Sequence, residues 1–212
     1  MLSTVTVKIG PAQEPVAREL AKLHCRIDHA SDDLLIDSYI QTARAMTEVY
    51  LNRSLITQTL TWTIRPEGNL RPENSRLWGV LTLPRSPVQT INSVTVTDDL
   101  GNVTVVAAGA LPIATQADLL GYWADLSLSP AKLRIGPYTV LIDGRVLKSA
   151  RLQHIQVEFV AGYGTTPAAL EPAIKNAVLM TVCHLYEHRG DDGAGMPMAV
   201  EWLLDPYRVV PI

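Results

Sequence analysis

The chain has 212 residues, of which 47% are hydrophobic and 18% are charged, and its formal net charge is −3. This composition is too apolar for a disordered chain and predicts one sizeable core, or a core with an inserted subdomain. The acidic excess lies in residues 163–212, which carry 3 basic and 6 acidic groups, and the basic surface typical of nucleic-acid-binding proteins is not visible.

Neither a membrane span nor a secretion signal is evident. The longest apolar run, Ala177 to Tyr186, is about half the roughly 20 residues that a span requires, and residues 1–9 lack the charged and apolar regions of a signal peptide. We therefore expect synthesis in the cytoplasm and no contact with a membrane. In that reducing compartment, Cys25 and Cys183 are expected to be buried free thiols.

The first helix is predicted over residues 12–23. Val16, Leu20 and Leu23 recur there at the spacing of an amphipathic helix, so they are expected to share its buried face. The sequence Asp28-His29-Ala30 separates this helix from the next.

A second, longer helix is predicted to begin after Ser31, whose hydroxyl suits the N-cap position. Asp32 and Asp33 follow, where negative charge favours the positive end of the helix dipole. Apolar or small residues then recur on one face for about five turns, and the pattern stops near Asn52.

Helical periodicity returns after residue 162. Pro172 suits the first turn of a helix that runs to about Arg189 and is apolar around most of its circumference, which predicts burial. The glycine-rich sequence 190–195 predicts a flexible break, and a short helix is predicted over residues 197–204.

Between these helical parts, residues 55–162 show the period-2 pattern of strands. From residue 55 to 64 the even positions are mostly apolar and the odd positions from 57 to 63 are threonine. Further strands are predicted, in chain order, at 77–83, 91–97, 103–106, 132–135, 139–142 and 154–160, with a hairpin loop at 98–102, an irregular stretch at 107–131 and a turn at 143–144.

These elements together predict an α+β fold. The N- and C-terminal helices, in residues 1–54 and 163–212, are expected to form a small helical bundle with a C-terminal docking segment. Residues 55–162 are expected to form an inserted antiparallel subdomain similar to a β-barrel or sandwich.

One motif suggests zinc chemistry. His184, Glu187 and His188 form an H-x-x-E-H pattern, in which two histidines on one helix face can bind zinc and the glutamate can act as a base. A catalytic zinc needs a third protein ligand, and Glu201 is the sole glutamate that follows. The alternative is that both histidines end the helix, where partial positive charge complements the helix dipole. We favour the second interpretation.

A second group, His24, Cys25 and His29, could bind a metal only if a distant fourth ligand came near. The sequence does not assemble a nucleophile, a base and an oxyanion site. We therefore expect no catalytic residues, no metal and no cofactor, and a protein that is not an enzyme.

Several short motifs become informative when they are read in order. They are LHCRID at 23–28, DDLLI at 32–36, RSLITQT at 53–59, LPRSPV at 83–88, VEFVAGYG at 157–164, PAIK at 172–175 and YEHR at 186–189. In this order the chain resembles the head–tail connector (adaptor) family of tailed phages, in the branch with a β insertion that is shared with prophages and gene transfer agents. The resemblance covers nearly the whole chain and is poorest over 107–152.

The resemblance implies a structural virion protein of the neck, made in the bacterial host cytoplasm. Its copies would form a ring, commonly twelve-fold, beneath the portal protein. That ring would give double-stranded DNA a passage without sequence-specific binding and give the stopper and other tail-side neck proteins a platform. Two alternatives remain open: another neck component, such as a stopper or tail-completion protein, and a zinc-dependent hydrolase that uses the H-x-x-E-H motif.

Under the connector interpretation, the C-terminal segment is expected to bind the portal or a neighbouring copy. Aromatic and arginine side chains are the usual anchors of protein interfaces. The candidate contact residues are Trp202, Leu203, Tyr207, Arg208, Val209 and Val210.

Overall fold

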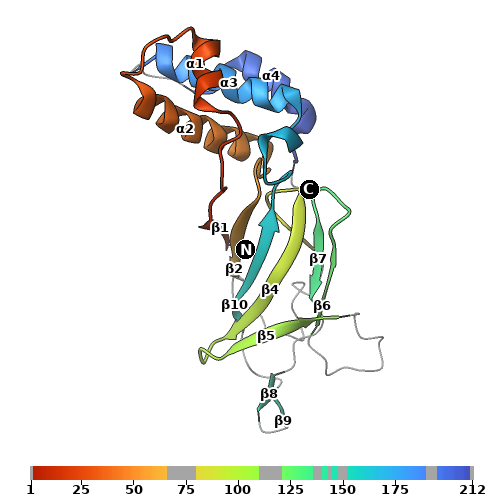
Figure 1. The fold of residues 1–212 in the computed structure, drawn as a ribbon. Helices are drawn as coiled ribbons and strands as arrows, with labels where there is room; N and C mark the ends of the chain where they lie inside the picture. The colour runs from red at the N-terminus through yellow and green to blue at the C-terminus, as the bar shows by residue number, and fades with distance from the viewer. Residues whose placement is uncertain are drawn as a thin grey trace. The chain divides into compact units, whose positions relative to one another are not determined.

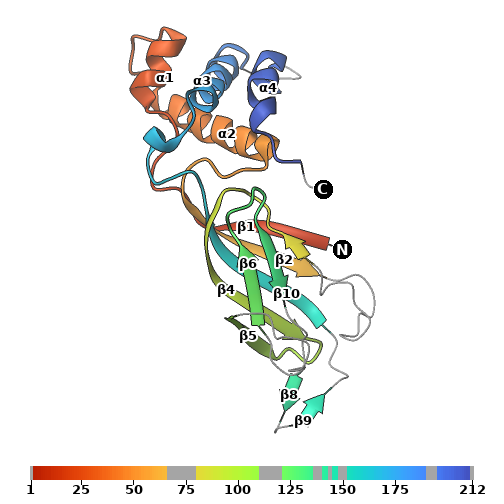
Figure 2. The same ribbon diagram turned by 90° about the vertical axis from the view of Figure 1, so that its right-hand side faces the viewer.

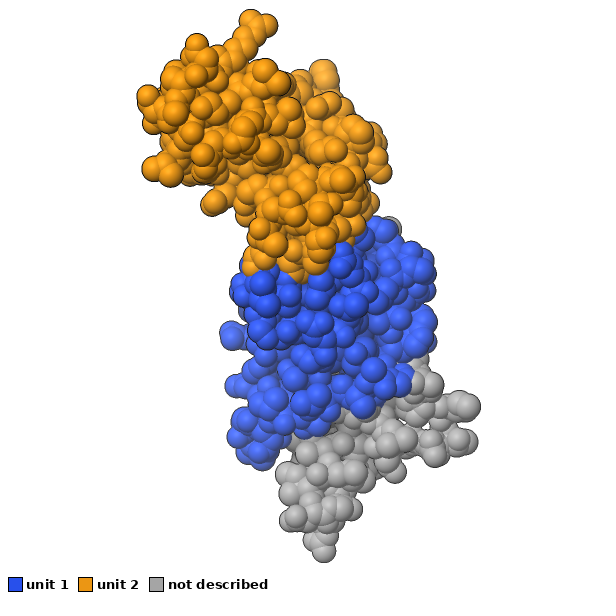
Figure 3. Space-filling model, in the orientation of Figure 1, with its two compact units in different colours: residues 1–9, 59–161 blue, residues 10–58, 162–212 orange. Residues whose placement is uncertain are grey.

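The computed structural model describes residues 2–65, 80–109, 121–135, 140–142, 145–147, 152–189 and 195–210. The fold is mixed α+β, as the sequence predicts. It divides into two compact units, coloured in Figure 3. The sheet unit is Met1–Ile9 with Thr59–Ala161, and the helical unit is Gly10–Gln58 with Gly162–Ile212. Each unit has its own hydrophobic core.

The sheet unit is built on one strongly curled eight-stranded sheet (Figure 1). Its strand order is β1-β2-β10-β4-β5-β6-β7-β3, and β8 and β9 form a separate two-stranded pair. The strands are β1 (Leu2–Ile9), β2 (Gln58–Arg65), β3 (Val80–Thr82), β4 (Val88–Asp98), β5 (Val103–Ala108), β6 (Gly121–Asp125), β7 (Lys132–Ile135), β8 (Val140–Ile142), β9 (Arg145–Leu147) and β10 (Leu152–Ala161).

The period-2 pattern of β2 determines which of its side chains enter the core of the sheet unit. Leu60, Trp62 and Ile64 are buried while the threonines between them are partly exposed, as the alternation predicts. The predicted hairpin is also confirmed, because β4 and β5 pair antiparallel with Thr97 opposite Val103. Phe159 of β10 is fully buried in the same core.

Three strands were not predicted, and one pairing differs from the prediction. The strands that were not predicted are β1, β6 and β9. β1 pairs with β2, β9 pairs with β8, and β6 lies in the stretch that was expected to be irregular. The sheet is also not purely antiparallel, because β5 and β6 run parallel. The predicted turn at 143–144, all but the last residue of the glycine-rich break at 190–195, and parts of the predicted strands at 77–83 and 139–142 lie outside the described residues.

The helical unit contains α1 (Arg18–Cys25), α2 (Asp33–Leu51), α3 (Pro172–Glu187) and α4 (Met198–Leu204), with 3₁₀ turns at Pro167–Ala169 and Asp205–Tyr207. α3 packs against α2 and lies between α1 and α4 (Figure 2). The predicted burial of α3 is confirmed, since Ile174, Val178 and Val182 are almost fully buried. α2 ends as predicted at Asn52, whose φ of 52° is the left-handed conformation that asparagine tolerates.

The start of the helical unit differs from the prediction. α1 begins at Arg18 rather than at residue 12, because Pro15 disfavours helical backbone at the residue before it. Val16 is buried as expected, but Leu20 and Leu23 are 45% and 75% exposed. The predicted N-cap at Ser31 is also wrong: the cap is Asp32, which makes no side-chain capping hydrogen bond.

Residues 55–57, just before β2, and residues 162–164, just after β10, lie side by side in the helical unit. Tyr163 donates its backbone N–H to the carbonyl of Leu55 at 3.2 Å, and Thr57 donates to Gly164 at 2.9 Å. Gly162 has φ +140°, and a Cβ there would lie 2.5 Å from the backbone nitrogen of Thr57. Glycine is therefore required both for its backbone conformation and for this close approach.

We predict that Gly162→Ala destabilises the protein by more than about 1 kcal/mol, because the added methyl group clashes with backbone and the φ value is strained. The matched control is Gly10→Ala, since a Cβ at Gly10 meets nothing within 4 Å. Chemical denaturation of both variants measures the difference. Equal unfolding midpoints for the two variants would contradict the role assigned to Gly162.

Candidate interaction surfaces

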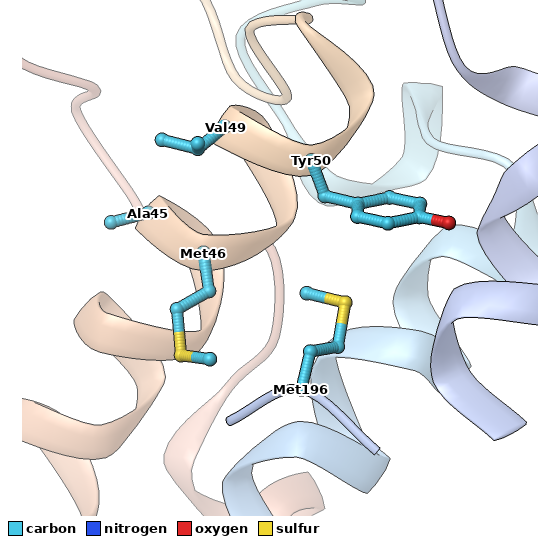
Figure 4. Close-up of a pocket in the computed structure, with 5 residues that line it drawn as sticks. All are labelled: Ala45, Met46, Val49, Tyr50 and Met196. Carbon is cyan, nitrogen blue, oxygen red and sulfur yellow. The ribbon is translucent and has the colours of Figure 1, made fainter. Parts of the chain in front are cut away.

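An apolar pocket opens on the second half of α2. It is lined by Ala45, Met46, Val49, Tyr50 and Met196 and has a volume of about 440 Å³. We call it the α2 pocket. Met46 reaches into it from α2 and Met196 from the segment before α4, while the Tyr50 ring borders it (Figure 4). Methionine side chains adapt to irregular apolar partners, so this lining suits a hydrophobic protein contact.

Charged groups surround Tyr50 at the edge of this pocket. The Tyr50 hydroxyl donates a hydrogen bond to the Asp205 carboxylate, and the Arg208 guanidinium lies 4.9 Å from the centre of the Tyr50 ring. The hydrogen bond to Asp205, with burial and the nearby charges of Asp205 and Glu201, raises the pKa of Tyr50. The edge of the pocket therefore carries two carboxylates and one guanidinium.

The six residues predicted as C-terminal contacts divide into inward and outward groups. Val209 is buried, and its N–H donates to the carbonyl of Leu51 at 2.9 Å. Leu203 and Tyr207 pack against the helical core, and the Tyr207 carbonyl accepts a hydrogen bond from Arg53 at 2.6 Å. Trp202, Arg208 and Val210 are exposed.

The outward group gains one residue that sequence reasoning missed. Met198 is 64% exposed and precedes Trp202, which is 69% exposed, by four positions. Residues four apart lie on one helix face, so the two side chains form an apolar ridge on α4. The buried Val200 and Leu204 mark the opposite face, and the i, i+4 spacing of Met198 and Trp202 was the sequence signal for it.

A second exposed apolar ridge lies on α1 and consists of Leu20 and Leu23. We call it the α1 ridge. The periodicity of the sequence predicts that these leucines are buried, but α1 presents a different face to the protein because its basic groups bind α2. Arg18 donates to the Asp37 carboxylate, and the Lys22 ammonium lies 2.6 Å from Asp33. These ion pairs hold α1 on the first half of α2.

A small network joins the end of α3 to the start of α2. The Asp32 carboxylate accepts hydrogen bonds from the Tyr186 hydroxyl at 2.7 Å and from Arg189 at 3.0 Å. The Arg189 guanidinium also lies 4.2 Å from the centre of the Tyr186 ring. The hydrogen bond from Tyr186 and then that from Arg189 lower the pKa of Asp32.

The two groups of residues weighed above as metal ligands do not form a ligand cluster within the described residues. The His184 and His188 rings lie 4.2 Å apart, and His188 Nδ1 is 3.0 Å from the carbonyl oxygen of His184. Across the described ranges, no three histidine, cysteine, aspartate or glutamate side chains are placed to hold a metal ion. This includes the group His24, Cys25 and His29.

The two cysteines are free, as expected, but they are half-buried rather than buried. They lie on α1 and α3. Burial, with a contribution from the neighbouring Cys183 thiol, raises the pKa of Cys25 to about 12. Since the thiolate is the reactive form of cysteine, this higher pKa disfavours reaction at Cys25.

Of the helices that the structure describes, none is both long and apolar enough to cross a membrane.

We predict that Asp32 makes the helical unit sensitive to acid. Because folding lowers its pKa, the stabilisation is complete above the ordinary carboxyl pKa of 3.8 and is lost as the pH falls through the lower folded-state value. Asp32→Asn should lower the melting temperature at pH 7 and reduce the further loss between pH 7 and pH 3.

The control for this measurement is Asp28→Asn, which removes an exposed aspartate with no side-chain hydrogen bond among the described residues. It should leave the melting temperature and its pH dependence close to those of the unmodified protein. An unchanged pH dependence in Asp32→Asn would contradict the network's role.

Comparison with known proteins places this fold. Residues 19–99 match the phage gp6-like head-tail connector protein family. A chain in the neck of an empty gene transfer agent particle, computed with C6 symmetry, is 24% identical with a TM-score of 0.65, and the match covers 100% of this chain and 97% of that chain. A search of curated proteins found no significant match.

Two further structures have the same fold. A chain in the virion of a native gene transfer agent particle is 23% identical with a TM-score of 0.65, covering 99% of this chain and 97% of that chain. A chain in the neck of a native gene transfer agent particle, computed with C12 symmetry, is 24% identical with a TM-score of 0.61, covering 98% and 97%. The motif order, the match over residues 19–99 and the shared fold agree: the chain is similar to phage gp6-like head-tail connector proteins over residues 19–99, and nearly its whole length has the fold of chains from gene transfer agent particles.

Proposed function

We propose that copies of this chain form a ring in the neck of a phage-like particle, beneath the portal protein, and that the ring is twelve-fold. The observation that carries the proposal is the match to the connector family over residues 19–99, which include α2 and the strands β2, β3 and β4. The fold is also shared over nearly the full length with chains from gene transfer agent necks. In this position the ring would connect the head to the stopper and other tail-side proteins.

The distribution of apolar surface supports a ring of this kind. A ring of identical subunits uses heterologous contacts, in which one surface of a copy meets a different surface of the next. The helical unit has the α1 ridge, the α2 pocket and the Met198–Trp202 ridge as separate apolar surfaces. A subunit between two neighbours and a portal needs several such surfaces.

The charge of the chain suits a passage for double-stranded DNA. Each phosphate that a protein neutralises adds affinity and would slow movement of the DNA. A net charge of −3 avoids tight, sequence-independent binding. We propose that DNA passes through the ring without sequence-specific contacts and that the chain has no enzymatic activity, in keeping with its structural family.

We also propose a division of labour between the two parts of the chain predicted from the sequence. Residues 1–54 and 163–212 would carry the ring and portal contacts. The barrel-like insertion at 55–162 would be a separate module. Reconstruction of the neck from intact particles tests this arrangement directly, and a position on the tail side of another adaptor ring would favour the stopper alternative.

The outward C-terminal residues are proposed to contact the portal. Deleting residues 196–212 would be a poor test, because Val200, Leu204 and Val209 are buried in the helical unit. Trp202→Asp and Val210→Asp change only exposed side chains, so the protein should fold normally. We predict that either variant reduces the joining of portal-containing capsids to tails by about tenfold or more, as loss of an interface hot spot does.

The matched control is Val105→Asp on β5, an exposed valine of the sheet unit (70% exposed, against 63% for Val210). Electron microscopy of the assembly mixture counts joined particles, and circular dichroism checks folding. Normal joining by both C-terminal variants would remove these residues from the portal contact.

A further inference from the structure

We propose that Cys25 and Cys183 form a reversible disulfide bond, which fastens α1 to α3 when the protein meets an oxidant of the small-disulfide class. Both cysteines are free thiols in this structure. The bond lies within one subunit, so it does not depend on the ring and can be tested on the purified chain.

The two thiols are remote in sequence but adjacent in the fold. Cys25 is the last residue of α1 and packs against the core of the helical unit, and Cys183 lies in the second half of α3. α1 and α3 pack against each other, and the Cys25 thiol donates a hydrogen bond to the Cys183 sulfur. A disulfide requires two cysteine side chains that point toward each other. Thiols that share a hydrogen bond meet this requirement.

The surroundings of the pair assign different roles to the two sulfurs. Both side chains are half-buried, so a small molecule can reach them. Burial raises the pKa of both thiols, and the negative charge of Glu187 adds to this effect. The hydrogen bond from Cys25 has the opposite effect on Cys183 and lowers its pKa. Because the thiolate is the nucleophile, Cys183 is the attacking sulfur and Cys25 reacts second.

The reaction is thiol–disulfide exchange, with oxidised glutathione as a representative oxidant. The Cys183 thiolate attacks one glutathione sulfur, the S–S bond of the oxidant breaks, and one glutathione thiolate leaves. Cys25 then loses its proton to solvent and attacks the Cys183 sulfur of this mixed disulfide, which releases the second glutathione. The protein gives up two electrons and two protons, and the oxidant is reduced to two thiols.

The bond would strengthen a weakly attached helix. Within α1, all of which the structure describes, only Ala21 is fully buried. The helix is held on α2 by the ion pairs of Arg18 with Asp37 and of Lys22 with Asp33. Partly exposed ion pairs contribute little to stability and weaken as salt rises. A covalent bond at the end of α1 is independent of salt, and it also lowers the conformational entropy of the unfolded chain.

The redox state of the pair would follow the location of the protein. Thiols stay reduced in a reducing cytoplasm and pair in the oxidising environment outside the cell. The subunit would therefore assemble with α1 free to adjust, and the bond would form after the particle is released. This timing rests on the proposed function, whereas the bond itself does not.

Treatment of the purified full-length chain with oxidised glutathione, followed by mass spectrometry, tests the bond. We expect the intact mass to fall by the mass of two hydrogen atoms and a cross-linked peptide that joins Cys25 to Cys183 to appear. A reductant should reverse both changes. The melting temperature of the oxidised chain should rise by roughly 5 °C or more above that of the reduced chain.

Several results would overturn the proposal. They are thiols that stay free, mixed disulfides with glutathione that persist at both cysteines, covalent dimers, and a melting temperature that does not rise. The single variants Cys25→Ser and Cys183→Ser are the controls. Neither can form the bond, so the same treatment should produce no cross-linked peptide and no rise in melting temperature.

A charge variant tests the geometry around the pair. The Cys183 thiol lies 3.6 Å from the carboxylate of Glu187, which is exposed. Glu187→Gln removes a negative charge that disfavours the thiolate, so the bond should form several-fold faster at neutral pH. The matched control is Glu171→Gln, an exposed glutamate about 18 Å from Cys183 along the helix, which should leave the rate unchanged. Equal rates for the two variants would contradict the placement of the thiols beside Glu187.

Failure of this inference is distinguishable from failure of the proposed function. If the purified chain forms the bond but neck reconstruction finds no ring, the proposed function falls and the bond stands. If the ring is found but the purified chain forms no bond, the reverse holds. Rapid alkylation of cell lysates and of released particles tests the timing, and a bond already present in the lysate would contradict it.

Discussion

The fold depends on one constraint, which is that the chain leaves and re-enters the helical unit at adjacent points. The backbones of residues 55–57 and 162–164 are hydrogen-bonded to each other, and the absence of a side chain at Gly162 permits their approach. The Glu48 carboxylate of α2 reinforces the same place by accepting hydrogen bonds from Leu55 N–H and the Gln58 side chain, both at 2.9 Å. Bringing the two ends of the long insertion together has an entropic cost. These hydrogen bonds offset part of that cost.

The other segments of the helical unit are attached at different points along α2. Ion pairs attach α1 to the first half of this helix, and the C-terminal segment binds its last turn through Tyr50, Leu51 and Arg53. The core is filled by α3, so α1 and α4 are left at the flanks with apolar side chains exposed. The helical unit therefore combines enough burial for a stable fold with exposed apolar surface of the kind that marks interaction sites.

Much of the architecture was predictable because it rests on local periodicity. The threonine alternation of β2, the length of α2 and its end at Asn52, and the burial of α3 all follow from the period of the side chains. The strands β1 and β6 were not predicted because neither alternates buried with exposed side chains. Most side chains of β1 are exposed, and most of those of β6 are partly exposed. In addition, β1 pairs with β2, which is remote from it in sequence.

The sequence by itself determined the α+β class, the order of most elements and the resemblance to head–tail connector proteins, because motif order and periodicity are properties of the linear chain. Only the tertiary structure decided which apolar residues are covered. Leu20 and Leu23 have the spacing of core residues, yet Arg18 and Lys22 turn another face of α1 toward α2. Val209 is predicted as a contact residue, yet it is buried against the end of α2. Burial depends on where distant segments pack, and that information is absent from any local pattern.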